Sequence, residues 1–147
     1  DITAEELEGR NQRSALFKTM FLAFRAAGTK DWRSHLAIAL DHSGVQHRLQ
    51  FHHIFPKAVL KTSFTAREAD DIANLAFIGG KTNRAISDKA PAVYLPPLVD
   101  QLGEPAFAAQ CIPVEASLLE VESYKAFLLE RRKRIATALN TFVGPAD

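Results

Sequence analysis

The chain begins with a helical pattern of apolar residues. Between residues 14 and 27, large side chains recur at three- and four-residue spacing: Phe17, Met20, Phe21 and Phe24. We expect a helix here that Gly28 ends, because glycine readily takes the conformation that follows a helix C-terminus. The acidic segment 3–13 either extends this helix or forms a separate turn. Residues 31–42 predict a second helix, with Ser43-Gly44 as its stop.

Two segments in the middle of the chain have the pattern of β-strands. Residues 45–51 alternate apolar and polar side chains and lead directly into His52-His53. Residues 74–80, "NLAFIGG", form a short apolar run closed by two glycines. An isolated pair of strands is only marginally stable in water, so flanking helices must hold this pair.

The remaining segments predict helices. One or two turns are expected over 57–61, and "TARE" from Thr65 to Glu68 is a capping box that predicts a helix over 66–73. A short helix is expected over 81–89. A longer helix is expected over 91–102, with Pro91 at its first position. From residue 114 to 143 the pattern is again helical. The expected inward side chains of the C-terminal helix are Tyr124, Phe127, Leu128, Ile135, Leu139 and Phe142.

These elements predict a mainly α fold with a small two-stranded antiparallel β-hairpin inside a helical shell. At 147 residues the chain is long enough for one compact domain with its own core. We divide it into an N-terminal helical part over 1–44, a central part over 45–90 that holds both strands, and a C-terminal helical part over 91–147.

The composition of the chain restricts the possible classes of protein only slightly. The net charge is +1, yet residues 45–89 carry seven Lys and Arg against four acids, which makes a modestly basic centre. Cys111 is the only cysteine, so no disulfide framework is possible and a small core residue is expected. The single cysteine fits a reducing cytoplasmic setting, and we expect a cytoplasmic protein. No apolar run has the length of a membrane span. The chain starts with Asp1, which indicates a fragment of a longer polypeptide.

Four polar residues interrupt apolar segments at the strands. His52 and His53 end the first strand, Asn74 precedes the second, and Asn83 follows it on the short helix. Pairing of the two strands brings all four within reach of one another. Pro56 ends the hydrogen-bonding pattern of the strand and forces the residue before it into an extended conformation, which offers a bend that lets both histidines serve one cavity.

The segments "HHIFP" and "NLAFIGGKTN" resemble the ββα-metal (His-Asn-His, HNH) nuclease motif. The longer sequence over residues 45–96 looks like the C-terminal nuclease domain of modification-dependent (type IV) restriction proteins, which act in bacterial phage defence. Their N-terminal half is a nucleotide-hydrolysing ParB-like domain. The resemblance implies a ββα-metal core, DNA as substrate, and such a ParB-like domain as partner, on the same or another chain.

The resemblance also implies roles for individual residues. His53 is the expected general base that activates water, and Asn74 the residue that holds the loop so that His53 is aimed correctly. His52, where many relatives have Asp, and Asn83 are the expected ligands of a divalent metal ion. Lys81, Arg84 and Lys57 are the candidate DNA-phosphate contacts.

The chemistry needs these residue types. Hydrolysis of a phosphodiester needs a base that titrates near neutral pH, which histidine provides, and a cation that offsets charge on the phosphate. Because neither expected ligand is a carboxylate, imidazole nitrogen favours Mn²⁺, Co²⁺ or Ni²⁺ over Mg²⁺.

Each assignment has an alternative. The two histidines could be satisfied structural residues, Asn74 a helix cap and Asn83 a solvent-facing residue. The basic run 130–134 is more typical of a solvated helix face than of a DNA contact. A non-catalytic DNA-binding or interaction domain that retains the ββα scaffold is the alternative function. A structural zinc module needs four ligands and is disfavoured by the lone cysteine.

Overall fold

The computed structural model describes residues 1–30, 32, 51–78, 86 and 88–144. The predicted helix over 31–42 and strand residues 45–50 lie outside these ranges, apart from Trp32. Most of the short helix predicted over 81–89 also lies outside them.

The described chain is mainly helical, with one small sheet of two antiparallel strands, as predicted. Its elements in chain order are α1 (Ala4–Leu7), α2 (Ala15–Ala26), β1 (His52–His53), α3 (Lys57–Leu60), α4 (Ala66–Ala69), the 3₁₀ helix η1 (Ile72–Asn74), β2 (Leu75–Ala76), α6 (Pro91–Leu102), α7 (Pro105–Ala108), the 3₁₀ helices η2 (Ala116–Leu118) and η3 (Val121–Ser123), and α8 (Tyr124–Val143). No described helix is both long and apolar enough to cross a membrane.

The sheet joins the two segments that carry the sequence motif. His52 pairs with Ala76 and His53 with Leu75, and the Ile54 amide donates to the Asn74 carbonyl at 2.8 Å. Both strands are short, because Asn74 belongs to η1 and the regular pairing covers two residues on each side. The connection between the strands is residues 54–74, which contain α3, α4 and η1, in place of a tight turn.

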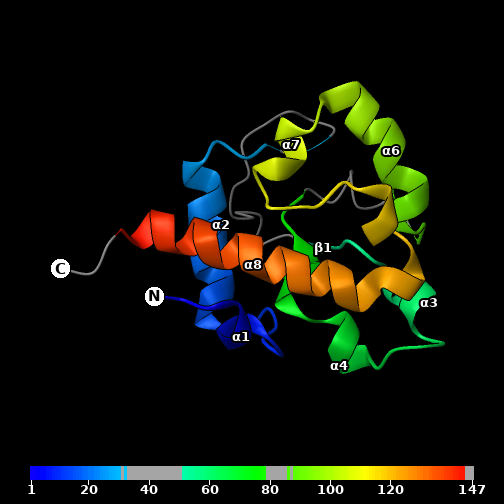
Figure 1. The fold of residues 1–147 in the computed structure, drawn as a ribbon, viewed down its shortest axis with the longest axis horizontal. Helices are drawn as coiled ribbons and strands as arrows, with labels where there is room; N and C mark the ends of the chain where they lie inside the picture. Colours follow the sequence, from blue (N-terminus) through cyan, green and yellow to red (C-terminus); the bar gives the residue numbers. More distant parts are fainter. Residues whose placement is uncertain (31, 33–50, 79–85, 87, 145–147) are drawn as a thin grey trace, which may run out of the picture.

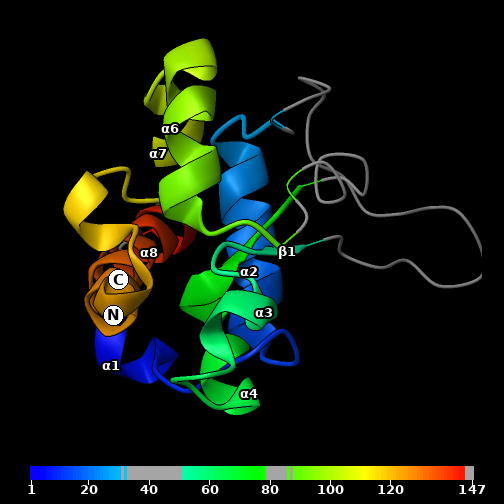
Figure 2. The same ribbon diagram turned by 90° about the vertical axis from the view of Figure 1, so that its right-hand side faces the viewer.

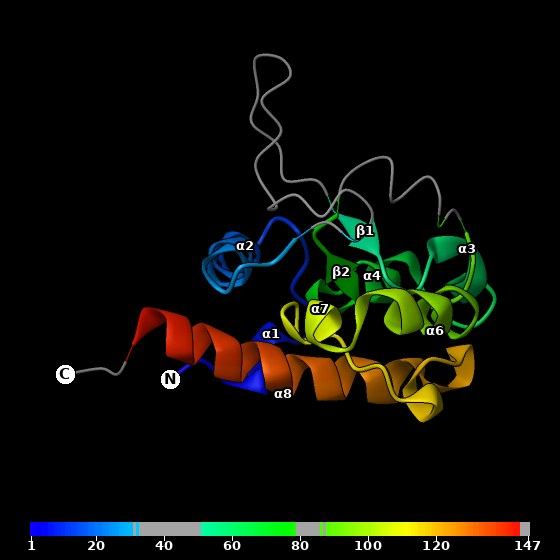
Figure 3. The same ribbon diagram turned by 90° about the horizontal axis from the view of Figure 1, so that it is seen from above.

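Helices surround this sheet. Figure 1 shows α8 running across the molecule, with α6 and α7 above it and α1 and α4 below. In the view turned by 90°, α6 lies above β1, while α3 and α4 lie below it (Figure 2). From above, the strands lie between α2 and α3, and α8 extends along one side (Figure 3). Helix α8 packs against α1, α2 and η1.

Helix α2 confirms the first predicted helix. The Ser14 side chain caps it by accepting from the Leu16 amide, and Gly28 follows it with a φ of 83°. The predicted apolar face is buried. The rings of Phe17, Phe21 and Phe24 on this face all contact the ring of Phe77, the residue after β2. The distances between ring centroids are 4.8, 5.4 and 5.9 Å. Aromatic packing therefore fixes α2 against the sheet.

The capping box at Thr65 is confirmed, but its helix is shorter than predicted. The Thr65 and Glu68 side chains each bond the other's backbone amide, and α4 then ends at Ala69 in place of residue 73. The Asp71 carboxylate accepts from the Ala73 amide at 2.9 Å and so begins η1. This second cap competes with continuation of the first helix.

The C-terminal segment differs from the prediction in three respects. Helix α8 begins at Tyr124, and the residues from 114 to 123 form η2, η3 and irregular chain. Of the six side chains expected to face inward, five are buried, but Phe142 is 42% exposed. The basic run 130–134 is not wholly solvated, because Arg131 is 0% exposed.

The first residues of the chain are bonded to α8 near its last turn. Asn140 of α8 accepts from the Ile2 amide and donates to the Ile2 carbonyl, both at 2.8 Å. Helix α1 is a separate short helix rather than an extension of α2. Cys111 is a free, buried thiol, as expected, and burial raises its pKa.

Candidate functional site

His53 lies on β1 and contacts a carboxylate from the end of α4. Its Nε2 lies 2.8 Å from Asp70 Oδ1, and the two side chains are 23% and 28% exposed. A carboxylate accepts hydrogen bonds and does not donate them, so the His53 Nε2 carries the proton in this contact. In the neutral ring, Nδ1 then has the lone pair.

Asp70 also forms an ion pair with a lysine. The Lys57 ammonium lies 3.1 Å from the same Oδ1 atom, although the Lys57 side chain is itself 54% exposed. Partial burial acts to raise the pKa of Asp70, but the hydrogen bonds from His53 and Lys57 outweigh it, and the pKa is lowered. Asp70 is therefore a carboxylate at neutral pH.

His52 points to a different partner. Its side chain is buried at 3% exposure, and its Nε2 lies 3.4 Å from the Tyr94 hydroxyl on α6. That hydroxyl donates its only proton to the Ile54 carbonyl at 2.7 Å. The hydroxyl therefore has no second proton to donate to the His52 ring in the longer contact. Burial raises the pKa of Tyr94, so the hydroxyl stays protonated.

The neighbouring histidines thus bind different elements. His52 contacts α6 and His53 contacts the residue after α4. Adjacent residues on a strand point to opposite faces, and this alternation accounts for the difference. The hypothesis that both rings serve one cavity stays a prediction.

Asn74 ties the two ends of the strand connection together. It is 0% exposed, and its Oδ1 accepts from the Phe55 amide at 2.7 Å. Its Nδ2 donates to the carbonyls of Phe55 and Ala69 at 3.0 and 2.9 Å. All three partners are backbone groups, so the side chain fixes the path of the chain directly after His53.

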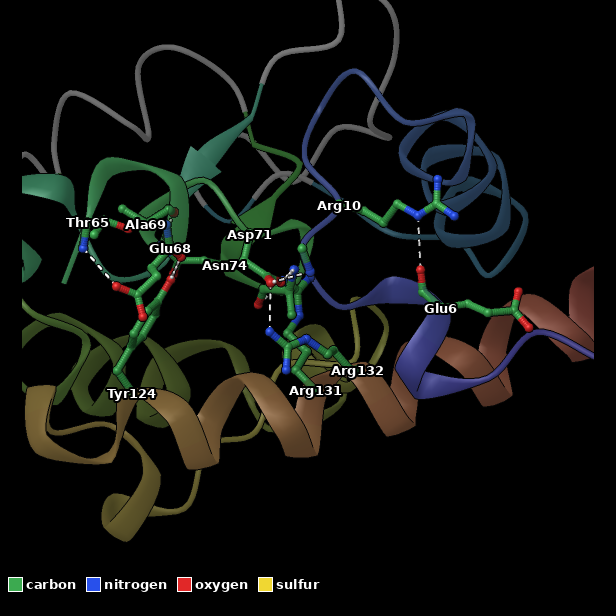
Figure 4. A network of polar contacts seen from close by, with 12 residues as sticks. Glu6, Arg10, Thr65, Glu68, Ala69, Asp71, Asn74, Tyr124, Arg131 and Arg132 are labelled. Carbon is green, nitrogen blue, oxygen red and sulfur yellow. Dashed lines mark hydrogen bonds and ion pairs between the residues drawn. The ribbon is translucent and has the colours of Figure 1, made fainter.

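A buried arginine supports Asn74 from α8 (Figure 4). Arg131 Nη1 donates to the carbonyls of Ala73 and Leu75, the two neighbours of Asn74, at 2.8 and 2.7 Å. Its Nη2 donates to the Gln110 carbonyl at 3.1 Å. Burial lowers the pKa of Arg131 to about 10, so the guanidinium remains charged at neutral pH.

The Gln110 side chain binds the backbone of Phe77, the residue directly after β2. Its amide accepts from the Phe77 N–H at 2.8 Å and donates to the Phe77 carbonyl at 2.9 Å, as a neighbouring strand would do. Before η1, the Asp71 carboxylate accepts from Arg132 at 2.7 Å and from the Gly9 amide at 3.2 Å. The segment from Asp71 to Phe77 is therefore held by polar side chains on both sides.

Three predicted site residues lie outside the described ranges: Asn83, Lys81 and Arg84. One of the two expected metal ligands, His52, is therefore described and the other is not. Among the described residues, no group of three or more His, Cys, Asp or Glu side chains could hold a metal ion.

Sequence reasoning missed four residues that shape the site: Asp70, Tyr94, Gln110 and Arg131. The acidic pair before Asn74 was a usable signal for Asp70, since charged residues rarely stand in an apolar segment without a partner. Tyr94 follows Pro91 on the buried side of a predicted helix. Gln110 and Arg131 gave no signal, because their partners are backbone groups distant in sequence.

We compared the chain with models of known protein families, with curated proteins and with solved structures, and none of them matches.

Proposed function

We propose that this protein is a metal-dependent DNA endonuclease of the HNH, or ββα-metal, type. The observation that carries the proposal is the position of His53. Its partly exposed ring lies on a two-residue strand that pairs directly beside Asn74, and Asn74 holds the backbone that follows. A base that must reach water needs such partial exposure on a fixed support.

In the proposed reaction, His53 Nδ1 takes a proton from a water molecule. The resulting hydroxide attacks phosphorus, the bond from phosphorus to the 3′-oxygen breaks, and that oxygen takes up a proton from solvent. A base positioned in this way typically contributes about 10²–10⁴-fold to the rate. Asn74 contributes indirectly, since it fixes the backbone that supports the ring.

A divalent ion completes the proposed site. When bound, it supplies positive charge that offsets the charge on the phosphate. We propose His52 as the first ligand, as the resemblance implies; an imidazole nitrogen of this side chain would hold the ion. Imidazole nitrogen suits Mn²⁺, Co²⁺ or Ni²⁺ better than Mg²⁺. We propose Asn83 as the second ligand, as the resemblance implies.

The DNA contacts of the proposed enzyme are basic side chains at the edge of the site. Lys57 is exposed and lies at the start of α3, within 3.1 Å of Asp70. We propose it as a phosphate contact together with Lys81 and Arg84, which gives weak, salt-dependent affinity with little choice of sequence. In this proposal the module acts in the cytoplasm with a ParB-like domain in phage defence.

Incubation with supercoiled plasmid tests the proposal. Wild-type protein with Mn²⁺ should convert the plasmid to nicked or linear forms, and added chelator should stop the conversion. Intact plasmid in the presence of every divalent ion tried, together with measurable DNA binding, would instead support a non-catalytic DNA-binding domain.

A further inference from the structure

Asp70 is the one carboxylate within hydrogen-bonding distance of His53 in the described part of the chain, and no sequence motif assigned it a role. The contact is short, at 2.8 Å between His53 Nε2 and Asp70 Oδ1. Both side chains are about three-quarters buried, which reduces competition from water.

The position of Asp70 is fixed by its surroundings. It is the C-terminal cap of α4, and its amide donates to the Ala66 carbonyl at 3.1 Å. The Lys57 ammonium on α3 bonds the same carboxylate oxygen as His53. Asn74 binds the carbonyl of Ala69, the residue directly before Asp70. The carboxylate and the strand that carries His53 are therefore fixed by one set of bonds.

We propose that Asp70 is the positioning residue of His53, and that it holds the proton on Nε2 and the lone pair on Nδ1. This inference rests on the proposed function and deepens it. A histidine acts as base only through an unprotonated nitrogen, and the hydrogen bond at one ring nitrogen decides which nitrogen that is. When Nδ1 accepts the proton from water, the ring becomes a cation, and the adjacent carboxylate stabilises it.

The assignment gives each partner a distinct task. His53 would touch the attacking water and is the catalytic residue. Asp70 acts through His53, and Lys57 helps to keep Asp70 in place. A carboxyl-to-amide change at Asp70 preserves the size of the side chain but allows it to present an N–H to Nε2, which favours the wrong tautomer.

The test combines two measurements on Asp70→Asn, with Asp100→Asn as the matched control. Asp100 is an exposed residue of α6 with no hydrogen bond or ion pair among the described residues. Nitrogen NMR of ¹⁵N-labelled histidine, recorded at a mildly alkaline pH, reports which ring nitrogen of His53 carries the proton. Plasmid cleavage reports activity, and thermal melting reports folding.

We expect the wild type and Asp100→Asn to show His53 protonated on Nε2. Asp70→Asn should shift the proton partly to Nδ1 and lose at least about tenfold in cleavage, because the wrong tautomer has no lone pair on Nδ1 to accept the proton. An unchanged His53 tautomer in Asp70→Asn overturns the proposal, whatever the activity. A shifted tautomer with full activity overturns it as well.

If the protein is not a nuclease, the results differ from those that overturn the role of Asp70. In that case the wild type does not cleave DNA with any divalent ion, while the NMR measurement still decides whether Asp70 fixes the His53 ring. Asp70→Ala provides a second variant should Asp70→Asn melt at a much lower temperature. It removes the hydrogen-bond acceptor altogether, and the same two outcomes apply.

Discussion

Asn74 and Phe55 exchange two hydrogen bonds between side chain and backbone. The Phe55 amide donates to Asn74 Oδ1, and Asn74 Nδ2 donates to the Phe55 carbonyl. The amide group of Asn74 thus replaces a neighbouring strand at the point where β1 ends. Together with the backbone bond from Ile54 to Asn74, this pairing fixes the chain directly after His53.

We predict that Asn74→Ala lowers both stability and cleavage. Three buried backbone groups lose their partner, and each such group costs roughly 1–3 kcal/mol. The free energy of unfolding should fall by at least about 2 kcal/mol in urea titration. Asn11→Ala is the control, because the side-chain bond of Asn11, which accepts from the Arg13 amide, is exposed. Unchanged unfolding of Asn74→Ala would show that these bonds contribute nothing to stability.

The buried guanidinium of Arg131 gives the next prediction. Arg131→Met removes the donors to the carbonyls on both sides of Asn74, so we expect a loss of stability of about 1–3 kcal/mol and reduced cleavage. Lys133→Met, on the exposed face of the same helix, should leave both properties near wild type. Equal effects of the two substitutions would contradict a supporting role for Arg131.

The two tyrosines of the chain give a prediction about alkaline pH. Burial is the main cause that raises the pKa of both Tyr94 and Tyr124 above the ordinary value of 10.0. A raised pKa in the folded state means that stability is fully present below pH 10 and decreases as the pH rises above it. Absorbance titration should show tyrosinate only as the protein unfolds, whereas in urea both tyrosines should titrate near pH 10. Tyrosinate formed in the folded protein near pH 10 would refute the burial of these hydroxyls.

A metal series tests the role of His52. Cleavage by the wild type should be faster with Mn²⁺, Co²⁺ or Ni²⁺ than with Mg²⁺, because imidazole suits the transition metals. His52→Asp should shift the ranking toward Mg²⁺. An unchanged ranking in His52→Asp would show that His52 is not a ligand, and its contact with Tyr94 would then be purely structural.

Local sequence signals predicted the helices that depend on local interactions. The face of α2, the capping box at Thr65 and Pro91 at the start of α6 are all present, because each depends on residues a few positions apart. The predicted end of α4 and the predicted start of α8 were wrong. Asp71 begins a new turn by bonding Ala73 and Arg132, and the second of these partners lies 61 residues away.

The site was only partly predictable for the same reason. The pattern of apolar and polar residues predicted that the two strands pair. The observed pairing places His53 opposite Leu75, the residue after Asn74. Asp70 was not predicted, since its contact with His53 depends on how α4 packs beside β1. Arg131 appeared to belong to a solvated basic face, because nothing local shows that three carbonyls surround it.

The most direct test of the central claim is the cleavage rate of His53 variants. His53→Ala removes the base, and His53→Gln keeps an N–H donor for Asp70 but has no nitrogen that can accept a proton. We predict that both variants fold and bind DNA, that both lose at least about 10²-fold in plasmid cleavage with Mn²⁺, and that added imidazole partly restores His53→Ala. Cleavage by His53→Gln at the wild-type rate would contradict the account, since His53 could not then be the base.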